Sequence, residues 1–244
     1  MAWIRAATRR LTRLLALAAS FVPGMALAAI VVASSGPSAD RFPAGKKLDD
    51  DARITLRKGD SVTVLDRHGT KVLRGPGRFN VSDPKRPLPN PAFAILTRLR
   101  SSGRTAIGAV RTGEDGQPLS PNLWYVDFAR PGAKCLADPA NLNLWRTDTE
   151  ASAQYRIASA GRIETTIYFG KDDALAAWDN SKLPVAADQT YLITNEDGEE
   201  VSELTFVILT QIPDDQEGLA SVLIDNGCTA QLDLLAEHLS TARR

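Results

Sequence analysis

Short apolar runs that end in turn sequences occupy two stretches of this chain, and they constrain its fold more than any other feature. In residues 29–81 such runs lie at 54–56, 62–65 and 72–73, and turns such as Gly75-Pro76-Gly77 separate them. Successive side chains of a strand point to opposite faces, and closely spaced turns force the chain to reverse direction every few residues. The sequence therefore predicts a small antiparallel meander over 29–81.

A second set of alternating runs lies between residues 122 and 208. The alternating positions are Trp124, Val126 and Phe128; Ala153, Tyr155 and Ile157; Ile163, Thr165, Ile167 and Phe169; Tyr191 and Ile193; and Leu204, Phe206 and Ile208. Asn195-Glu196-Asp197-Gly198 supplies a turn between the last two runs. Five strands in about 90 residues favour a β-sandwich over an α/β sheet. We expect a mainly β protein of the α+β class, with a β-sandwich-like domain over 122–244.

The end of the chain changes to helical spacing. Asp214 and Glu217 form an Asp-x-x-Glu capping box, apolar residues then recur every three or four positions, and Asn226-Gly227 ends the segment. Thr229 can cap a second helix. The sequence thus predicts a C-terminal helical hairpin with Cys228 at its corner.

Residues 82–121 connect the two β regions. Four prolines within 82–91 exclude a regular helix or a central strand, so this segment is predicted to be a semi-rigid linker. Asn90 is expected to cap a short helix that begins at Pro91 and ends before Gly103. Its apolar face is expected to dock on one of the two β units, and the alternative is recruitment of a partner. That face consists of Phe93, Leu96 and Leu99.

The N-terminus has the pattern of an export signal. Four arginines precede an apolar stretch that runs from Leu14 to Ala28, and Ala26-Leu27-Ala28 is a small-x-small cleavage sequence. We predict a signal peptide over 1–28 that is cut between Ala28 and Ala29, and a mature protein in the periplasm or secreted. The alternative is an uncleaved N-terminal membrane anchor, because the uncharged run to Ala33 has the length of a spanning helix.

Cys135 and Cys228 are the two cysteines of the chain. In an exported protein such a pair favours a disulfide bond over a metal site or a nucleophile. A bridge closing about 94 residues would contribute roughly 4 to 5 kcal/mol in the chain-entropy model. Two separate buried thiols are the alternative. If the bridge forms, it pins the helical hairpin to the edge of the sandwich, and the segment 142–145 is expected to pack around it.

The charge of the mature chain makes a nucleic-acid partner unexpected. Loss of the leader removes four of the 29 basic residues and none of the 29 acidic ones, which leaves 25 against 29 and a net charge of about −4. Affinity for a phosphate backbone depends on a basic face. Contact with a membrane is expected only through the leader segment.

The turn sequences of the N-terminal stretch resemble a known family. Gly-Asp-Ser-Val-Thr-Val-Leu-Asp (59–66), His-Gly-Thr (68–70) and Leu-Arg-Gly-Pro-Gly-Arg-Phe (73–79) are similar to the periplasmic β-domain of FecR-type proteins. The resemblance covers about 50 residues. It implies an extracytoplasmic β-domain over 29–81 that senses or relays a contact, and it carries no catalytic residues onto this chain.

The sequence offers little support for catalysis. His68 and His238 have no Asp or Cys at metal-ligand spacing, so we assign no catalytic, cofactor-binding or metal-binding residues. Ser82-Asp83-Pro84-Lys85 matches the Ser-x-x-Lys of penicillin-binding enzymes, but Pro84 prevents the helix that this chemistry needs. The acidic runs 49–51 and 196–200 lack the ligand spacing of a calcium loop, and solvated turns are expected there.

Taken together, these features predict an exported, non-enzymatic binding, scaffold or sensory module of the bacterial envelope. Its expected partner is an envelope protein or surface component, reached through protein-protein contacts. The alternative is an envelope hydrolase or a carbohydrate-active protein with a loop-built site. At least two of the tryptophans Trp124, Trp145 and Trp178 are expected in the core rather than on a sugar-binding face.

Overall fold

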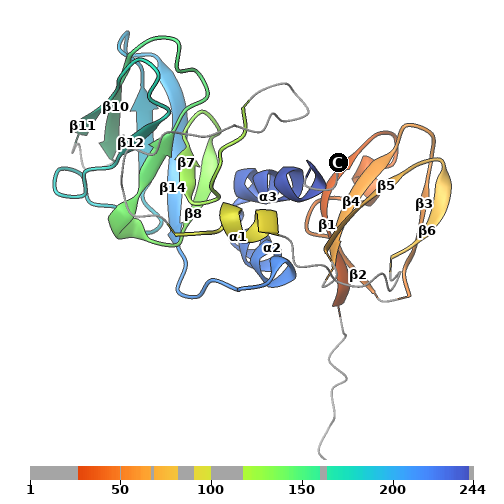
Figure 1. Ribbon diagram of the computed structural model, residues 1–244. Coiled ribbons are helices and arrows are strands. Elements are labelled where there is room, and N and C mark those ends of the chain that lie inside the picture. Colours follow the sequence, from red (N-terminus) through yellow and green to blue (C-terminus); the bar gives the residue numbers. More distant parts are fainter. Residues whose placement is uncertain are drawn as a thin grey trace, which may run out of the picture.

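Two β lobes flank a layer of helices (Figure 1). The computed structural model describes residues 27–49, 51–66, 69–81, 91–99, 118–159 and 164–241. The chain is mainly β, with two helices at its C-terminal end, which confirms the predicted α+β class. Most of the predicted leader, the proline-rich linker with its Ser-x-x-Lys match, and His68 lie outside the described residues.

The N-terminal lobe contains two antiparallel sheets. The first has the order β2 (Lys47–Asp49), β1 (Leu27–Ser35), β4 (Ser61–Asp66) and β5 (Gly69–Arg74); the second pairs β3 (Arg53–Leu56) with β6 (Gly77–Asn80). A short 3-10 turn, η1 (Ala39–Arg41), follows β1. The antiparallel pairing agrees with the sequence prediction, but the predicted single meander is wrong, because the strands divide into two sheets and do not all pair with their neighbours in sequence. The structure adds that β1 pairs with β4, and β3 with β6, across intervening strands.

Both faces of the central strand β1 are covered. Ala29 and Val31 point into the core between the two sheets of the lobe, whereas Val32 packs with Leu65 against the helices. The four residues from Ala29 to Val32 are at most 1% exposed. A strand buried on both faces reads as a continuous apolar run, which explains the sequence Ala-Ile-Val-Val.

One turn of this lobe requires glycine. Gly36 has a φ of 96°, and a Cβ atom on it would lie 2.4 Å from the carbonyl oxygen of Gly59. Beside it the buried Asp60 carboxylate accepts hydrogen bonds from the amides of Ser38 and Arg57. The pair Gly59-Asp60 therefore fixes the close approach of two loops.

The second lobe is a sandwich of two sheets. The larger has the order β11 (Glu164–Phe169), β10 (Ala153–Ser159), β13 (Thr190–Thr194), β14 (Glu200–Ile208) and β8 (Gly132–Leu136). The smaller consists of β12 (Leu175–Ala177), β9 (Asn143–Trp145) and β7 (Tyr125–Asp127), and η2 (Pro139–Asn141) precedes β9. A core of aromatic and aliphatic side chains fills the space between the sheets.

All five strands predicted in this lobe are present, and three more were not predicted. The unpredicted strands are β8, β9 and β12, of which β8 pairs with β14 in parallel and β9 with β7 in parallel. Tyr125 is buried as well as Trp124 and Val126, so β7 does not have the single buried face that its alternation predicts. Helices cover the second face of β8, where Ala133 and Cys135 pack against the helical layer.

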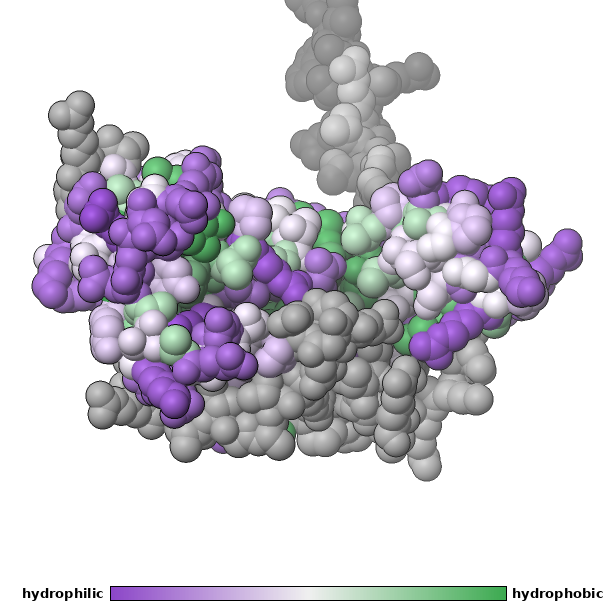
Figure 2. Space-filling model, turned by 90° about the horizontal axis from the view of Figure 1, so that it is seen from above, coloured by the Kyte–Doolittle hydropathy of each residue, from purple (hydrophilic) through white to green (hydrophobic). Residues whose placement is uncertain are grey.

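The helical layer joins the lobes. It consists of α1 (Pro91–Leu96), α2 (Gln216–Asp225) and α3 (Thr229–Thr241). Helix α3 contacts β1 and β5 on one side and β8 on the other, and one apolar cluster runs from Val32 of the N-terminal lobe to Cys135 of the sandwich. Figure 2 shows the hydrophilic residues mainly on the outer parts of both lobes and apolar residues between them.

The structure corrects three local predictions about the helices. The cap of α2 is Asp215, whose side chain accepts from the amide of Gly218, and not Asp214. Thr229 is the first residue of α3 rather than its cap. Helix α1 packs mainly on α3 rather than on a sheet, although Leu96 also accepts a hydrogen bond from the amide of Leu123 just before β7, and Leu99 is 54% exposed. The two cap corrections concern adjacent residues that the sequence makes nearly equivalent. Asn90 and Gly103 lie outside the described residues.

Within the described part of the chain, no helix combines the length and apolar character needed to cross a membrane.

Candidate functional site

A cavity of about 190 Å³ lies where the sandwich meets helix α3. Its walls come from the segment 118–120, from β7 and the loop after it, from β8, from the end of β9, and from the first turns of α3. The polar lining residues are Ser120, Tyr125, Asp127, Arg130, Lys134, Trp145, Thr147 and Gln231, and the apolar ones are Pro118, Leu119, Ala129, Ala230 and Leu234. Segments far apart in the sequence thus build one site.

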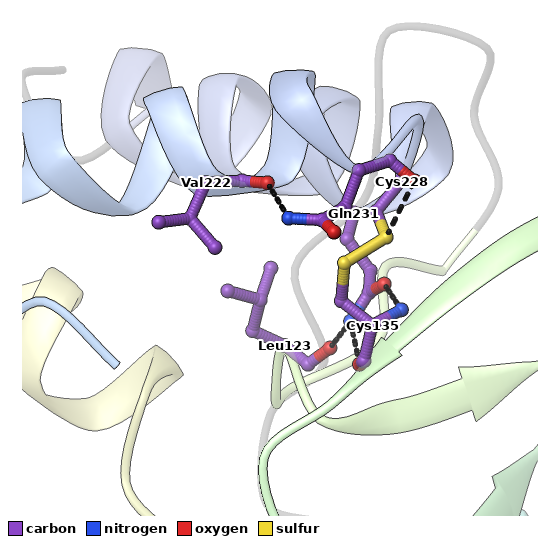
Figure 3. Close-up of a disulfide and its surroundings, with 6 residues drawn as sticks. Leu123, Cys135, Val222, Cys228 and Gln231 are labelled. Atoms are coloured by element: carbon purple, nitrogen blue, oxygen red, sulfur yellow. Dashed lines mark hydrogen bonds between the residues drawn. A yellow bond between two sulfur atoms is a disulfide. The ribbon is translucent and has the colours of Figure 1, made fainter. Parts of the chain in front are cut away.

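The disulfide bond and Gln231 hold the wall formed by β8 and α3 (Figure 3). Cys135 and Cys228 are joined with their Cα atoms 5.8 Å apart, as the sequence predicts, and β8 is an edge strand of the larger sheet. The Gln231 side-chain oxygen accepts from the amide of Cys135 at 2.7 Å. Its side-chain nitrogen donates to the carbonyls of Leu123 and Cys135, both at 2.9 Å. Three buried hydrogen bonds and one covalent bond therefore fix this wall.

The segment 142–145 does not pack around the bridge as predicted. Leu142 and Leu144 belong to the core between the two sheets of the sandwich, whereas both cysteines belong to the core of the helical layer. The difference arises because Leu142 and Leu144 face the core between the two sheets, whereas the bridge lies on the face of β8 that the helices cover.

Lys134 is the most unusual residue of the cavity. It precedes Cys135 in β8, so its side chain leaves the strand on the opposite side from the disulfide, and it is 2% exposed. Its Nζ atom has no hydrogen-bond partner among the described residues. Burial lowers the pKa of Lys134 from 10.5 to about 8, although the Asp127 carboxylate opposes part of this shift. A buried ammonium without a hydrogen bond destabilises a folded chain.

Arg146 shows how this protein satisfies a cation that has only a structural role. It is 6% exposed, and its guanidinium donates to the carbonyls of Asp173, Ala151 and Gly170 at 2.8 to 2.9 Å. It also lies over the ring of Phe169, 4.9 Å from the centroid. The absence of such acceptors around Lys134, within the described residues, distinguishes its environment from that of a structural cation.

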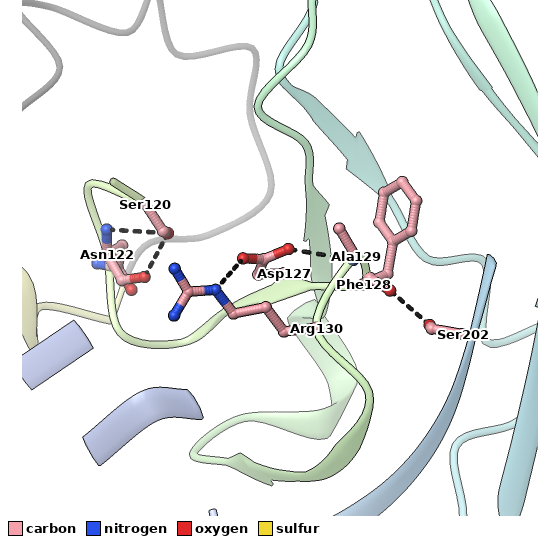
Figure 4. Close-up of polar contacts among 7 residues, drawn as sticks. All are labelled: Ser120, Asn122, Asp127, Phe128, Ala129, Arg130 and Ser202. Atoms are coloured by element: carbon pink, nitrogen blue, oxygen red, sulfur yellow. Dashed lines mark hydrogen bonds and ion pairs between the residues drawn. The ribbon is translucent and has the colours of Figure 1, made fainter. Parts of the chain in front are cut away.

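Asp127 and Arg130 form an ion pair at the rim of the cavity (Figure 4). The Arg130 Nε atom lies 3.3 Å from an Asp127 carboxylate oxygen, and the other oxygen accepts from the amide of Ala129 at 3.1 Å. Burial raises the pKa of Asp127, while the charges of Lys134 and Arg130 act in the opposite direction. Arg130 is 41% exposed and Asp127 19%, so the pair reaches solvent while Lys134 lies deeper.

Trp145 contributes a second buried donor without a partner. Its indole Nε1 makes no hydrogen bond within the described part of the chain, and the residue is 2% exposed. The other two tryptophans of the described residues are paired, since Trp124 donates to the carbonyl of Thr97 and Trp178 to that of Leu183. Buried indole nitrogens usually find an acceptor. All three tryptophans are buried, which confirms that at least two belong to the core.

Hydrogen bonds also fix the wall around Ser120. The Ser120 hydroxyl donates to the carbonyl of Asn122 at 2.8 Å, and the Asn122 side chain accepts from the amide of Trp124 at 2.9 Å. His238, expected in the last turn of the second helix, is buried, with its Nε2 atom 2.9 Å from the carbonyl oxygen of Ser120. His238 therefore supports this wall from behind and is not itself a lining residue.

The residues of this site were missed by sequence reasoning because β8 and β9 were not predicted. One signal was present: Lys134 interrupts the apolar run that leads into Cys135 and Leu136, and a charge beside a bridged cysteine in a buried strand is uncommon. Nothing in the sequence shows that Trp145 and Lys134 share a cavity. Among the described residues there is no cluster of three or more metal-ligand side chains.

Neither a family model, nor a curated protein sequence, nor a solved structure matches this chain. The FecR-like resemblance of residues 29–81 thus stays a prediction.

Proposed function

We propose that this protein is an exported, non-enzymatic binding module of the bacterial envelope, and that the cavity between the sandwich and helix α3 is its binding site. One observation carries the proposal: two residues that line the cavity, Lys134 and Trp145, have buried donors without an acceptor among the described residues. A bound molecule would supply the missing acceptors.

The composition of the cavity wall supports binding over the hydrolytic alternative. Its described lining includes one carboxylate, Asp127, which is engaged with Arg130. Glycoside hydrolysis ordinarily uses a pair of carboxyl groups that flank the scissile bond. Triad hydrolysis needs a nucleophile next to a base, and His238, the histidine of the described residues, faces the carbonyl of Ser120 from outside the lining.

The proposed location rests on the disulfide bond and the leader. A disulfide between Cys135 and Cys228 is compatible with an oxidising compartment outside the cytoplasm. The predicted cleavage between Ala28 and Ala29 places the mature chain in the periplasm or outside the cell.

Helix α3 gives the module a route from the cavity to a protein partner. Ala230, Gln231 and Leu234 line the cavity, and the same helix packs against β1 and β5 of the FecR-like lobe. We propose that the sandwich binds a small molecule and that the N-terminal lobe contacts an envelope protein. The FecR resemblance implies the same relay role.

A fragment screen against the mature protein tests the binding proposal. A set of anionic, neutral and cationic fragments of roughly 6 to 10 non-hydrogen atoms is scored by thermal shift and by ligand-observed NMR. Ala230→Phe, which places a ring at the cavity wall, should lose the hits that wild type gives. Turnover of a glycan or peptide library by the protein, with no fragment displaced by Ala230→Phe, would instead support the hydrolase.

A cross-linking experiment tests the partner proposal. Periplasmic cross-linking should recover an envelope protein through the N-terminal lobe, and recovery of the chain alone would contradict this part of the proposal.

A further inference from the structure

We infer that the cavity binds a small organic monocarboxylate, whose carboxylate is held by Lys134 and Trp145 and whose apolar body lies against Leu119 and Leu234. This inference rests on the proposal that the cavity is a binding site, and it adds the chemical class of the ligand. Four observations about the described residues support it: the charge balance, the direction of hydrogen bonding, the size of the cavity and the position of its apolar wall.

The charged residues that line the cavity, Lys134, Arg130 and Asp127, sum to one positive charge. Lys134 and Arg130 are cationic, Asp127 is anionic, and the 3.3 Å contact pairs Asp127 with Arg130. The next charged group is Asp233 on α3, which interacts with Arg130, is exposed and does not line the cavity. The Asp127 charge also acts on Lys134, but the Lys134 Nζ atom has no hydrogen bond among the described residues, so its donors are open to a ligand. One negative charge on a ligand would balance the net positive charge, whereas a second would itself be left unpaired.

The donors and their burial specify an acceptor. An ammonium and an indole N–H can only donate, so a ligand that satisfies both must present oxygen acceptors. A carboxylate has two oxygens and forms stronger hydrogen bonds with a cation than a neutral carbonyl does. Lys134 and Trp145 are each 2% exposed, so water competes poorly for these contacts.

Cavity size limits the ligand. The volume of about 190 Å³ is somewhat larger than the roughly 150 Å³ of an engineered apolar cavity that binds benzene. The rest of the wall has an apolar part, which includes Pro118, Leu119 and Leu234, and a polar part formed by Ser120, Thr147 and Gln231. An aromatic or short aliphatic acid of about 6 to 10 non-hydrogen atoms fits both the volume and the wall.

Protonation of Lys134 links binding to pH. In the free protein burial holds the pKa of Lys134 at about 8, against the opposing effect of Asp127. A bound carboxylate favours the charged amine and raises this pKa again. Binding is therefore strongest below pH 8, takes up a proton between pH 8 and about 10, and weakens over that interval. The other charged groups near Lys134 are Asp127, Arg130 and, behind Arg130, Asp233.

Calorimetric titration of the mature, disulfide-bonded protein tests the inference. The probes are benzoate and hexanoate, their neutral amides benzamide and hexanamide, and the cation benzylamine. We expect wild type to bind the two carboxylates at pH 7 at least ten-fold more tightly than their amides, and to bind benzylamine least. Lys134→Met keeps the length of the side chain, removes the charge, and should weaken carboxylate binding about ten- to a hundred-fold. Trp145→Phe should weaken it about three- to ten-fold.

The possible outcomes test the ligand class and the existence of the binding site separately. Lys171→Met changes an exposed lysine outside the lining and should leave the affinity unchanged. If amides and carboxylates bind equally, or if Lys134→Met binds benzoate as tightly as wild type does, the monocarboxylate inference is wrong while the cavity remains a binding site. If none of the five probes and no fragment binds, the inference and the proposed function both fail. We also expect that carboxylate binding to Lys134→Met takes up no proton between pH 8 and 10, unlike binding to wild type.

Discussion

Replacement of Lys134 by Met should stabilise the protein, which is an unusual expectation for a buried residue. The structure gives the magnitude. Burial lowers the pKa of Lys134 from 10.5 to about 8, and each pKa unit corresponds to about 1.4 kcal/mol of differential stability, so the buried charge costs about 3 kcal/mol at neutral pH. Methionine has a similar length and no charge to bury. Lys134→Met should therefore raise the free energy of unfolding at pH 7 by up to about 3 kcal/mol.

The pH dependence of this gain is its distinctive feature. Below pH 8 the amine is protonated in the folded and the unfolded chain, so the full cost is present. Between pH 8 and 10.5 the unfolded chain binds more protons than the folded one, and wild type gains stability as the pH rises. Other groups titrate alike in both proteins and cancel in the difference. The advantage of Lys134→Met should shrink by about 2 kcal/mol between pH 7 and pH 9.5.

Urea unfolding followed by tryptophan fluorescence measures this difference, because all three described tryptophans are buried in the folded state. The disulfide must stay oxidised, and m values must be equal for the comparison to hold. Lys171→Met, at an exposed position, should show no pH-dependent difference from wild type. A difference between Lys134→Met and wild type that stays constant from pH 7 to 9.5, or a variant less stable than wild type by more than about 1 kcal/mol, would refute the assignment of Lys134 as a buried, unpaired amine.

Three further predictions concern the covalent and hydrogen-bonded framework. Reduction of the bond between Cys135 and Cys228 should lower the free energy of unfolding by up to about 4 to 5 kcal/mol, measured as a shift in the urea midpoint with and without reductant. Gln231→Ala removes three buried hydrogen bonds and leaves the Leu123 and Cys135 carbonyls without their donor, so a loss of about 2 to 4 kcal/mol is expected in the same assay. The exported protein, analysed by intact mass under non-reducing conditions, should have the mass of the chain from Ala29 less two hydrogens.

Controls make these three outcomes decisive. Gln154→Ala changes a glutamine at an exposed position of β10 and should alter stability by less than about 0.5 kcal/mol. If the urea midpoint is unchanged after complete reduction, the bridge does not lower the conformational entropy of the unfolded chain enough to stabilise the fold. A retained leader, together with two thiols open to alkylation, would contradict the proposed compartment.

Much of the fold could be predicted because it rests on local pattern. The runs at Ile54, Val62 and Ile157 alternate with polar residues, and a strand with one solvated face produces that alternation wherever it lies. The short strands β8, β9 and β12 were not predicted, because they are three to five residues long and are buried on both sides or lie at an edge. Their sequences lack the period of two on which strand recognition depends.

The ends of helix α2 also show what the sequence can and cannot predict. The sequence places the end of α2 at Asn226-Gly227 correctly, because Gly227 adopts a φ of 69° that favours glycine. It does not decide between the adjacent Asp214 and Asp215 as the cap, since either carboxylate has the required chemistry. In the structure Asp215 is the cap, and its carboxylate accepts from the amide of Gly218 three residues later.

The cysteine pair, the turn sequences and the alternating apolar runs determined a β-rich, bridged protein on their own, because covalent chemistry and strand periodicity are properties of short segments. The cavity was decided by tertiary structure alone. Lys134, Trp145 and Gln231 come from two strands and a helix, and their proximity depends on parallel pairings and on a helix that packs between two lobes. A local pattern cannot encode such pairings, since the energy that selects them comes from apolar surface buried across the whole chain.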